Sequence, residues 1–278
     1  MWKFINESVA GTSHQVSGAV CQDASFVTPF CCVADRGLIL ACSDGAGSAK
    51  ESDVGSKLAC ETAIYSVMRF LQSDRTVADI EPNHILDWMR DIHAALSDAA
   101  EKHGTTPREL ACTLLLGIVG CNAAAFAQIG DGAIVISDGA VCRPVFWPQS
   151  GEYQNFTFFL TDPKFERNVQ CELLAQTVPE LALFSDGLQT LALKYDTRTA
   201  HQPFFMPLFS ALRKSEDPQE LANPMREFLG SAPVNDRTDD DKTLVLATQL
   251  TEEMALDIGR RAAGQVAHTT TENVDENL

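Results

Sequence analysis

The sequence predicts a mixed α+β protein in which most strands pair antiparallel. Short apolar runs rich in Val, Ile, Leu and Phe recur along the 278 residues and are typical of β-strands. The later runs follow one another too closely for helical crossovers, which favours antiparallel meanders over a parallel sheet. Two segments with helical spacing of apolar residues separate the first two runs, so a helical pair is inserted among the strands.

The individual elements can be placed from these runs. Strands are expected at 38–42, 113–119, 123–129, 133–136, 141–146, 181–184 and 243–247. The apolar spacing predicts the helical pair at 54–71 and 85–96. A further helix is expected over much of 203–228, with interruptions near Pro218 and Pro224, because proline lacks an amide hydrogen.

The end of the chain differs from the rest in composition. From residue 263 the sequence is polar and lacks any hydrophobic period, so residues 263–278 are expected to form a disordered tail. Residues 1–262 are interpreted as a single domain, a size that one hydrophobic core can support.

Charge and cysteine usage exclude several classes of protein. The formal net charge is −17, which argues against nucleic acid as a partner, because such binding depends on clustered Lys and Arg. No apolar run approaches the roughly 20 residues of a membrane span, so no membrane association is expected. The nine cysteines are odd in number and lie mostly within apolar runs, which indicates a reducing, cytoplasmic location.

The triplet Ser-Asp-Gly occurs three times, and the flanking residues distinguish the copies. The copy with Asp138 lies between two apolar runs, so a tight hairpin explains it. The copy with Asp44 follows "LILAC" but precedes small residues and a helix, which lets an ion or ligand approach the backbone. Asp186 lies at another strand end, after "LALF". Asp44 and Asp186 are therefore candidates for one shared site.

Other acidic segments lie next to predicted strands. Asp240 belongs to an Asp triplet directly before the last strand, and "CQDAS" supplies Gln22 and Asp23. Asp131 lies in "QIGDGAIVI", where a hairpin is an equally good explanation. Clustered carboxylates repel one another by about 1 kcal/mol or more per close pair, so such clusters usually bind a divalent cation. If the strand ends converge, they form a metal site.

The order of these motifs resembles that of the metal-dependent protein phosphatases of the type 2C or PPM family. The matching segments are "CQDA", "SDGAG", "ACTLLLGIV", "IGDGA", "FSDGL" and "DDKTLVL", within residues 10–250. The resemblance implies a four-layer α-β-β-α sandwich, in which two antiparallel sheets are flanked by helices. The helical insertion after Asp44 fits that plan.

The resemblance also implies a centre of two or three Mn²⁺ or Mg²⁺ ions. Asp44, Asp186 and Asp240 would hold the first ion. Asp44 and the carbonyl of Gly45 would share the second, and Gln22 stands where the family usually has a Glu ligand for it. A neutral Gln22 would weaken that second site.

The implied reaction is hydrolysis of a phosphomonoester by a two-metal-activated water. Asp23 would orient that water as a catalytic residue, and Asp131 would match the carboxylate of a third, weaker metal site. The implied activity is that of a serine/threonine protein phosphatase. A phosphorylated protein substrate and a cognate Ser/Thr kinase are the partners that the resemblance suggests.

Three departures from the family pattern leave alternatives open. Besides Gln22, Ala46 stands where the eukaryotic form has His, and no Arg precedes "CQDA" to bind phosphate. His14 is a candidate catalytic residue that would supply a proton or a hydrogen bond to phosphate, and a surface or structural histidine is the alternative. Asp241, where Asn is frequent, would add negative charge beside the metals. The runner-up function is a catalytically weak PPM-like regulatory module that binds a phosphoprotein or metal, and a small-molecule phosphatase is a third interpretation.

Overall fold

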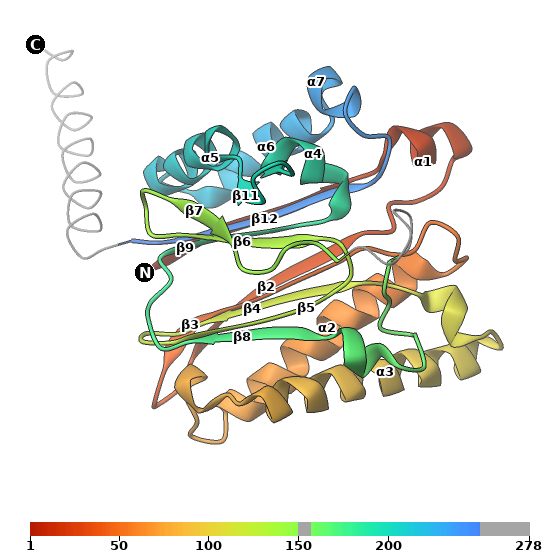
Figure 1. Cartoon of the computed structure of the whole chain (residues 1–278), viewed down its shortest axis with the longest axis horizontal. Helices are drawn as coiled ribbons and strands as arrows, with labels where there is room; N and C mark the ends of the chain where they lie inside the picture. The colour runs from red at the N-terminus through yellow and green to blue at the C-terminus, as the bar shows by residue number, and fades with distance from the viewer. Residues whose placement is uncertain (150–156, 251–278) are drawn as a thin grey trace, which may run out of the picture.

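Two five-stranded antiparallel sheets lie face to face and form the inner layers of the molecule (Figure 1). The computed structural model describes residues 1–149 and 157–250, so the expected tail at 263–278 lies outside the described residues. The first sheet has the order β1 (Trp2–Val9), β12 (Lys242–Gln249), β9 (Glu180–Phe184), β6 (Ala133–Ser137), β7 (Cys142–Pro144). The second has the order β2 (Ala24–Cys31), β3 (Arg36–Ser43), β4 (Leu114–Val119), β5 (Ala124–Ile129), β8 (Gln170–Leu174).

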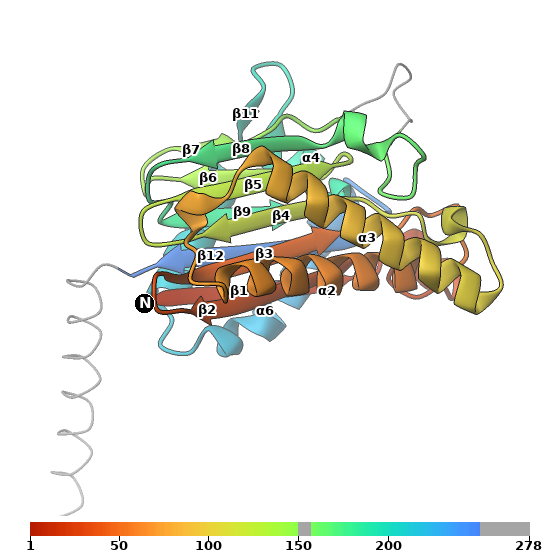
Figure 2. The ribbon, with the colours of Figure 1, turned by 90° about the horizontal axis from the view of Figure 1, so that it is seen from below.

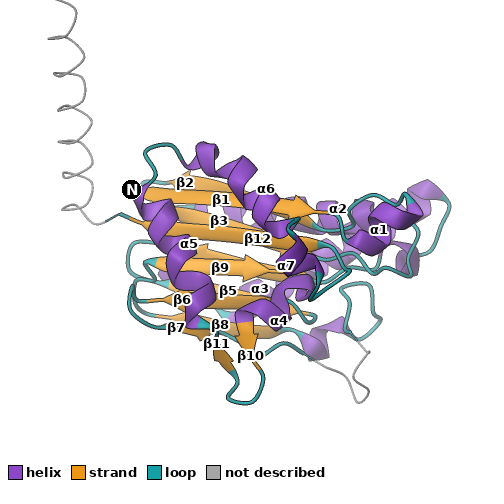
Figure 3. Ribbon diagram, turned by 90° about the horizontal axis from the view of Figure 1, so that it is seen from above, coloured by secondary structure: helices purple, strands orange, loops and turns teal. Residues whose placement is uncertain are grey.

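Helices cover the outer face of each sheet. Helices α2 (Ser52–Leu71) and α3 (Pro82–His103) lie across the second sheet (Figure 2). Helices α5 (Gln202–Lys214) and α6 (Ala222–Leu229) lie across the first (Figure 3). The predicted four-layer α+β sandwich is therefore confirmed. No helix within the described ranges is both long and apolar enough to cross a membrane.

Shorter elements complete the connections. The short α-helices are α1 (Thr12–Ser17), α4 (Gln189–Ala192) and α7 (Ala232–Asn235), and β10 (Leu193–Lys194) pairs with β11 (Thr199–Ala200). The 3₁₀ helices are η1 (Val77–Asp79), η2 (Pro107–Leu110), η3 (Phe165–Asn168), η4 (Asp186–Leu188) and η5 (Pro218–Leu221).

The core consists of three apolar layers, one between the sheets and one under each helical layer. Strand β3 shows how one segment serves two of them. Leu38 and Leu40 pack between the sheets, whereas Ile39 and Ala41 pack under α2 and α3. Successive side chains of a strand point to opposite faces, so a strand covered on both faces must be apolar at every position. This explains why the central strands read as continuous apolar runs.

Apart from the short pair β10 and β11, the strands that the sequence did not predict are edge strands of the two main sheets. Strands β1, β2 and β8 each lie at the edge of a sheet, and the predicted strand at 141–146 is shortened to edge strand β7. Edge strands carry polar residues and tolerate proline, as Pro29 in β2 illustrates, so they lack the strong apolar signal of the centre.

The prolines between 203 and 228 act differently from one another. The helix does end before Pro218, as predicted, and η5 follows. The predicted interruption at Pro224 is wrong, because this residue lies in the first turn of α6, where a backbone amide needs no partner within the helix.

The hairpin predicted at Asp138 is confirmed, because β6 and β7 pair around it. The Asp138 carboxylate accepts hydrogen bonds from the backbone amides of Ala140 (2.9 Å) and Val141 (2.8 Å), and Gly139 adopts a φ of 96°. The alternative interpretation of Asp131 as a hairpin residue is wrong. Its segment links β5 to β6, which belong to different sheets.

A close contact between α2 and η2 gives a test of this packing. A Cβ on Gly55 would lie 2.2 Å from the carbonyl oxygen of Leu110. Although alanine favours helix by about 1 kcal/mol over glycine, we expect Gly55→Ala to lower the free energy of unfolding by about 1 to 3 kcal/mol. Urea unfolding measures the change, with exposed Glu61→Ala of the same helix as the control. A raised unfolding free energy in Gly55→Ala would contradict the close approach.

Candidate metal centre

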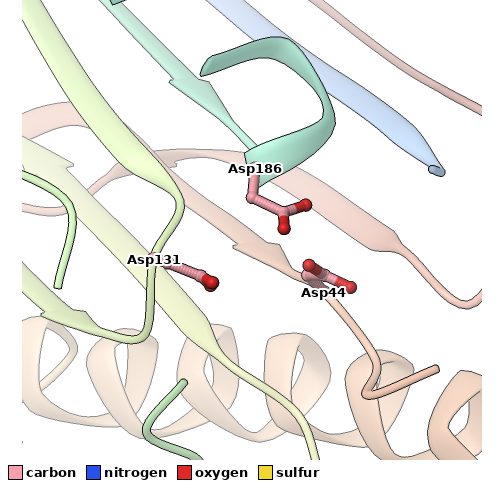
Figure 4. A group of neighbouring side chains, drawn as sticks. All are labelled: Asp44, Asp131 and Asp186. Carbon is pink, nitrogen blue, oxygen red and sulfur yellow. The ribbon is translucent and has the colours of Figure 1, made fainter. Parts of the chain in front are cut away.

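Three carboxylates converge at one end of the sandwich. Ligand oxygens of Asp44, Asp131 and Asp186 all lie within 4.8 Å of one another. Figure 4 shows the three carboxylates pointing toward a common point. Asp44 follows β3, Asp186 begins η4 after β9, and Asp131 lies in the β5–β6 connection, so both sheets contribute.

The Asp44 backbone is fixed by the start of β4. Its amide donates to the hydroxyl of Thr113 (3.0 Å), and its carbonyl accepts from the amide of Thr113 (2.8 Å). The next residue, Gly45, donates to the carbonyl of Gln22 (3.2 Å). A Cβ at Gly45 would lie 2.7 Å from the carbonyl oxygens of Gln22 and Ser52, so only glycine fits here.

Two glutamine side chains hold the loop that carries Asp131. The buried amide of Gln128 donates to the carbonyls of Gly130 (3.2 Å) and Gly132 (2.9 Å). The amide of Gln189 donates to the carbonyl of Asp131 itself. Three consecutive carbonyls are thus held by side chains, which fixes the direction of the Asp131 carboxylate. The sequence analysis did not identify Gln128 or Gln189, which lie outside any acidic motif.

Burial and mutual repulsion raise the pKa values of these acids. Burial, with the nearby charges of Asp131 and Asp240, raises the pKa of Asp186 to about 8. Burial and the charges of Asp23 and Asp186 raise the pKa of Asp44 well above its ordinary value. Burial also raises the pKa of Asp131. Without a cation, the folded protein therefore holds protons on this cluster at neutral pH.

The donor atoms fit a hard divalent cation. Oδ1 of Asp186 is buried and accepts no hydrogen bond from any residue that the structure describes. Mg²⁺ and Mn²⁺ prefer carboxylate and carbonyl oxygens, which are the atoms available here. The cluster and its unpaired oxygen fit such an ion.

Asp23 lies beside the cluster and is held by hydroxyl groups. Its Oδ2 lies 2.7 Å from both Ser185 Oγ and Thr243 Oγ1, and its Oδ1 is buried with no partner among the described residues. Burial raises the pKa of Asp23 to about 6, although the two hydroxyls act in the opposite direction. Ser185 and Thr243 belong to the motifs "FSDGL" and "DDKTLVL", but the sequence analysis gave them no role.

Gln22 presents an unpaired oxygen in the same region. Its Oε1 is buried without a hydrogen-bond partner in the described part of the chain, 3.9 Å from the position a Cβ would take on Gly47. Its backbone carbonyl accepts from the hydroxyl of Ser56 (2.6 Å). The side chain therefore lies against the loop that follows Asp44.

Asp240 and Asp241 have different environments. Asp240 is exposed and lies outside the group of three, although it is near enough to affect their pKa values. Asp241 is buried and acts as a structural tie. It accepts hydrogen bonds from the amides of Gly11 (2.7 Å) and Gln22 (2.6 Å) and lies 2.8 Å from Nδ1 of His14. His14 is therefore oriented by a carboxylate.

A sequence model of the family described as Protein phosphatase 2C matches residues 10–230. The chain belongs to this family. A curated relative, Serine/threonine-protein phosphatase 3 of Escherichia coli (strain K12), is 32% identical over 252 residues, which cover 88% of this chain and 98% of the relative. Membership confirms the resemblance seen in the motifs and the predicted class of enzyme, a metal-dependent protein phosphatase.

Solved structures of bacterial phosphatases share the fold. A bacterial serine phosphatase aligns with a TM-score of 0.61 at 16% identity, over 91% of this chain and 99% of that one. The catalytic domain of the serine/threonine protein phosphatase PstP, solved in complex with two manganese ions, aligns with a TM-score of 0.56 at 16% identity, over 89% and 97% of the two chains.

The raised pKa of Asp186 predicts how the metal-free phosphatase responds to pH. An unfolded Asp loses its proton near pH 3.9, whereas folded Asp186 keeps it until about pH 8. Between these values the folded state binds the extra proton, so stability falls as pH rises. We expect Asp186→Asn to reduce the fall in melting temperature between pH 5 and pH 8 in EDTA.

Differential scanning fluorimetry measures this fall. Asp138→Asn is the matched control, because Asp138 lies in an exposed turn whose amide hydrogen bonds lower its pKa. It should reproduce the wild-type pH dependence from pH 5 to pH 8. Equal slopes in wild type and Asp186→Asn would mean that Asp186 does not hold the proton.

Proposed function

We propose that this chain hydrolyses phosphoserine and phosphothreonine esters in a protein, with Mn²⁺ or Mg²⁺ bound at the converged carboxylates. The observation that carries the proposal is the approach of Asp44, Asp131 and Asp186 to within 4.8 Å. Three acids this close repel one another strongly, so a site of this kind is built for a cation. The runner-up, a catalytically weak regulatory module, is not favoured, because the chain belongs to the Protein phosphatase 2C family and is similar to a serine/threonine-protein phosphatase over most of its length.

The proposed ligand sets follow the sequence motifs. Asp44 and Asp186 would hold the first ion, and exposed Asp240 would complete its ligands. The carbonyl of Gly45 and Oε1 of Gln22, which accepts no hydrogen bond from the described residues, would bind a second ion together with Asp44.

The third proposed site depends on Asp131. Its Oδ2 accepts a hydrogen bond from the hydroxyl of Thr157 (2.6 Å), which leaves Oδ1 for an ion. Because one oxygen is shared with a hydroxyl, this ion would be held more weakly than one that takes both oxygens of a carboxylate.

Asp23 and His14 would contribute to the reaction beside the ions. Bound ions would polarise the phosphoryl group and lower the pKa of the attacking water. Asp23 offers its free Oδ1 as the acceptor of a hydrogen bond from that water, and its hydroxyl partners keep the carboxylate oriented. His14, held through Nδ1 by Asp241, would donate the Nε2 proton of its protonated form to the leaving serine or threonine oxygen.

The partner and the location are also proposals. The substrate is a phosphorylated protein, and a Ser/Thr kinase that forms the phosphoester is the natural counterpart of this reaction. All nine cysteines are free thiols, which is consistent with a reducing compartment such as the cytoplasm.

The first test compares two aspartates from identical Ser-Asp-Gly triplets. Asp44→Asn should lower Mn²⁺-dependent release of phosphate from an aryl phosphate on the order of 100-fold or more, because electrophilic stabilisation of several kcal/mol is lost. Asp138→Asn should keep near-normal turnover, since Asn suits the same turn. Full activity in Asp44→Asn would refute the assignment.

The second test adds a charge at Gln22. Gln22→Glu should lower the Mn²⁺ concentration needed for half-maximal activity, because a carboxylate near the second ion adds attraction on the order of a few kcal/mol before desolvation. The gain in rate should shrink at saturating Mn²⁺. A parallel Mn²⁺ titration of activity in wild type and Gln22→Glu measures the half-saturation point. Isothermal titration calorimetry reports Mn²⁺ binding without turnover. Identical half-saturation points would show that Gln22 does not face the metals.

A further inference from the structure

A groove of about 750 Å³ opens beside the metal centre. The loop after Asp44, the 3₁₀ helix η2 and the segment 157–163 line it. Two lining residues join it to the centre. The amide of Ala46 donates to the carbonyl of Ala111 (2.9 Å) just beyond Gly45, and the hydroxyl of Thr157 donates to the Asp131 carboxylate (2.6 Å). A phosphorylated residue at the centre would therefore have its neighbours in this groove.

The charges in the groove are not equally available. Glu109 accepts a hydrogen bond from the amide of Lys50 (3.0 Å), and Asp162 accepts one from the amide of Phe159 (3.0 Å). Arg108 is exposed, and its guanidinium forms no hydrogen bond or ion pair with any residue in the described ranges. The lining carboxylates are thus engaged with backbone amides, while the cation is free.

Neutral polar groups in the same groove suit an extended peptide. The hydroxyls of Ser48, Thr106 and Thr161 line it and make no side-chain hydrogen bond to the described part of the chain. Hydroxyls can donate to a carbonyl or accept from an amide, so they can satisfy a bound main chain. The walls thus offer hydroxyl groups and the guanidinium of Arg108, beside the carboxylates of Glu109 and Asp162 that accept backbone hydrogen bonds.

The position of Arg108 separates it from the reacting phosphate. The three clustered carboxylates are not among the residues that line the groove, although Thr157 in its lining donates to Asp131. Arg108 belongs to η2, whose C-terminal neighbour Ala111 accepts a hydrogen bond from the amide of Ala46. Arg108 therefore lines the groove and lies outside the group of three carboxylates.

We propose that this groove binds the substrate segment next to the phosphorylated residue, and that Arg108 selects an acidic side chain in that segment. The proposal rests on the proposed phosphatase function. Within a chain whose net charge is −17, the positive charge of Arg108 gives an acidic peptide a local point of attraction in the groove. Guanidinium groups pair with carboxylates through two parallel hydrogen bonds, which gives the contact its selectivity.

The experiment compares two phosphothreonine peptides that differ only in acidic or neutral residues flanking the phosphothreonine. Wild type should hydrolyse the acidic peptide with about two- to fivefold higher kcat/KM, the range expected for an exposed ion pair. Arg108→Gln should abolish this preference, and Arg108→Glu should reverse it. Turnover of a small aryl phosphate should be unchanged in both variants.

Arg36→Gln is the matched control, because Arg36 is also exposed but begins β3 at the opposite end of the strand from Asp44. It should keep the preference. Persistence of the preference in Arg108→Gln, or its absence in wild type, would overturn the proposal. Equal losses on peptide and aryl phosphate would also overturn it, since Arg108 would then act on the reacting phosphate.

A binding measurement separates this proposal from the catalytic one. Non-hydrolysable phosphonate versions of both peptides are titrated with wild type and Arg108→Gln in Mn²⁺, and fluorescence anisotropy reports affinity. If wild type binds the acidic peptide more tightly and Arg108→Gln loses this difference, the proposed role of the groove is supported even if no substrate is hydrolysed. Equal affinities for both peptides in wild type refute it even if hydrolysis is efficient.

Discussion

Repulsion among half-buried carboxylates is the constraint around which this structure is organised. Asp44, Asp131 and Asp186 come from three separate connections at one end of a sandwich, and no described cation side chain forms an ion pair with any of them. Burial and proximity raise their pKa values, so the folded chain tolerates them only as proton or cation carriers. The rest of the fold must supply enough packing to hold them together, which the three apolar layers do.

The polar side chains around the centre mainly hold backbone segments in place. Asp241 ties the amides of Gly11 and Gln22 and the ring of His14 to the start of β12. Gln128 does the same for the connection that carries Asp131. These bonds are buried or partly buried, where an unmade hydrogen bond is costly, so they fix the carboxylates more firmly than loops alone would. A metal centre made from loops thereby gains the rigidity of the sheets.

The metal centre and the adjoining groove differ in the charges that they present. The centre gathers carboxylates suited to a cation. In the adjoining groove the carboxylates accept backbone hydrogen bonds, and Arg108 forms no ion pair with any described residue. An acidic protein that acts on an anionic substrate needs positive charge at both places. Metal ions would supply it at the reacting phosphate, and Arg108 would supply it for the flanking segment.

The sequence by itself determined the central strands, the helical insertion after β3 and the acidic strand ends. Continuous apolar runs and ordered motifs are local features, and they suffice to distinguish the turn at Asp138 from the site residue Asp44. Only the tertiary structure decided which acids meet. It showed that the segment of Asp131 crosses between sheets and that Asp240 stays exposed, because both outcomes depend on how the two sheets stack. The edge strands and the structural role of buried Asp241 could not be predicted from the sequence either. Both depend on partners that are distant along the chain.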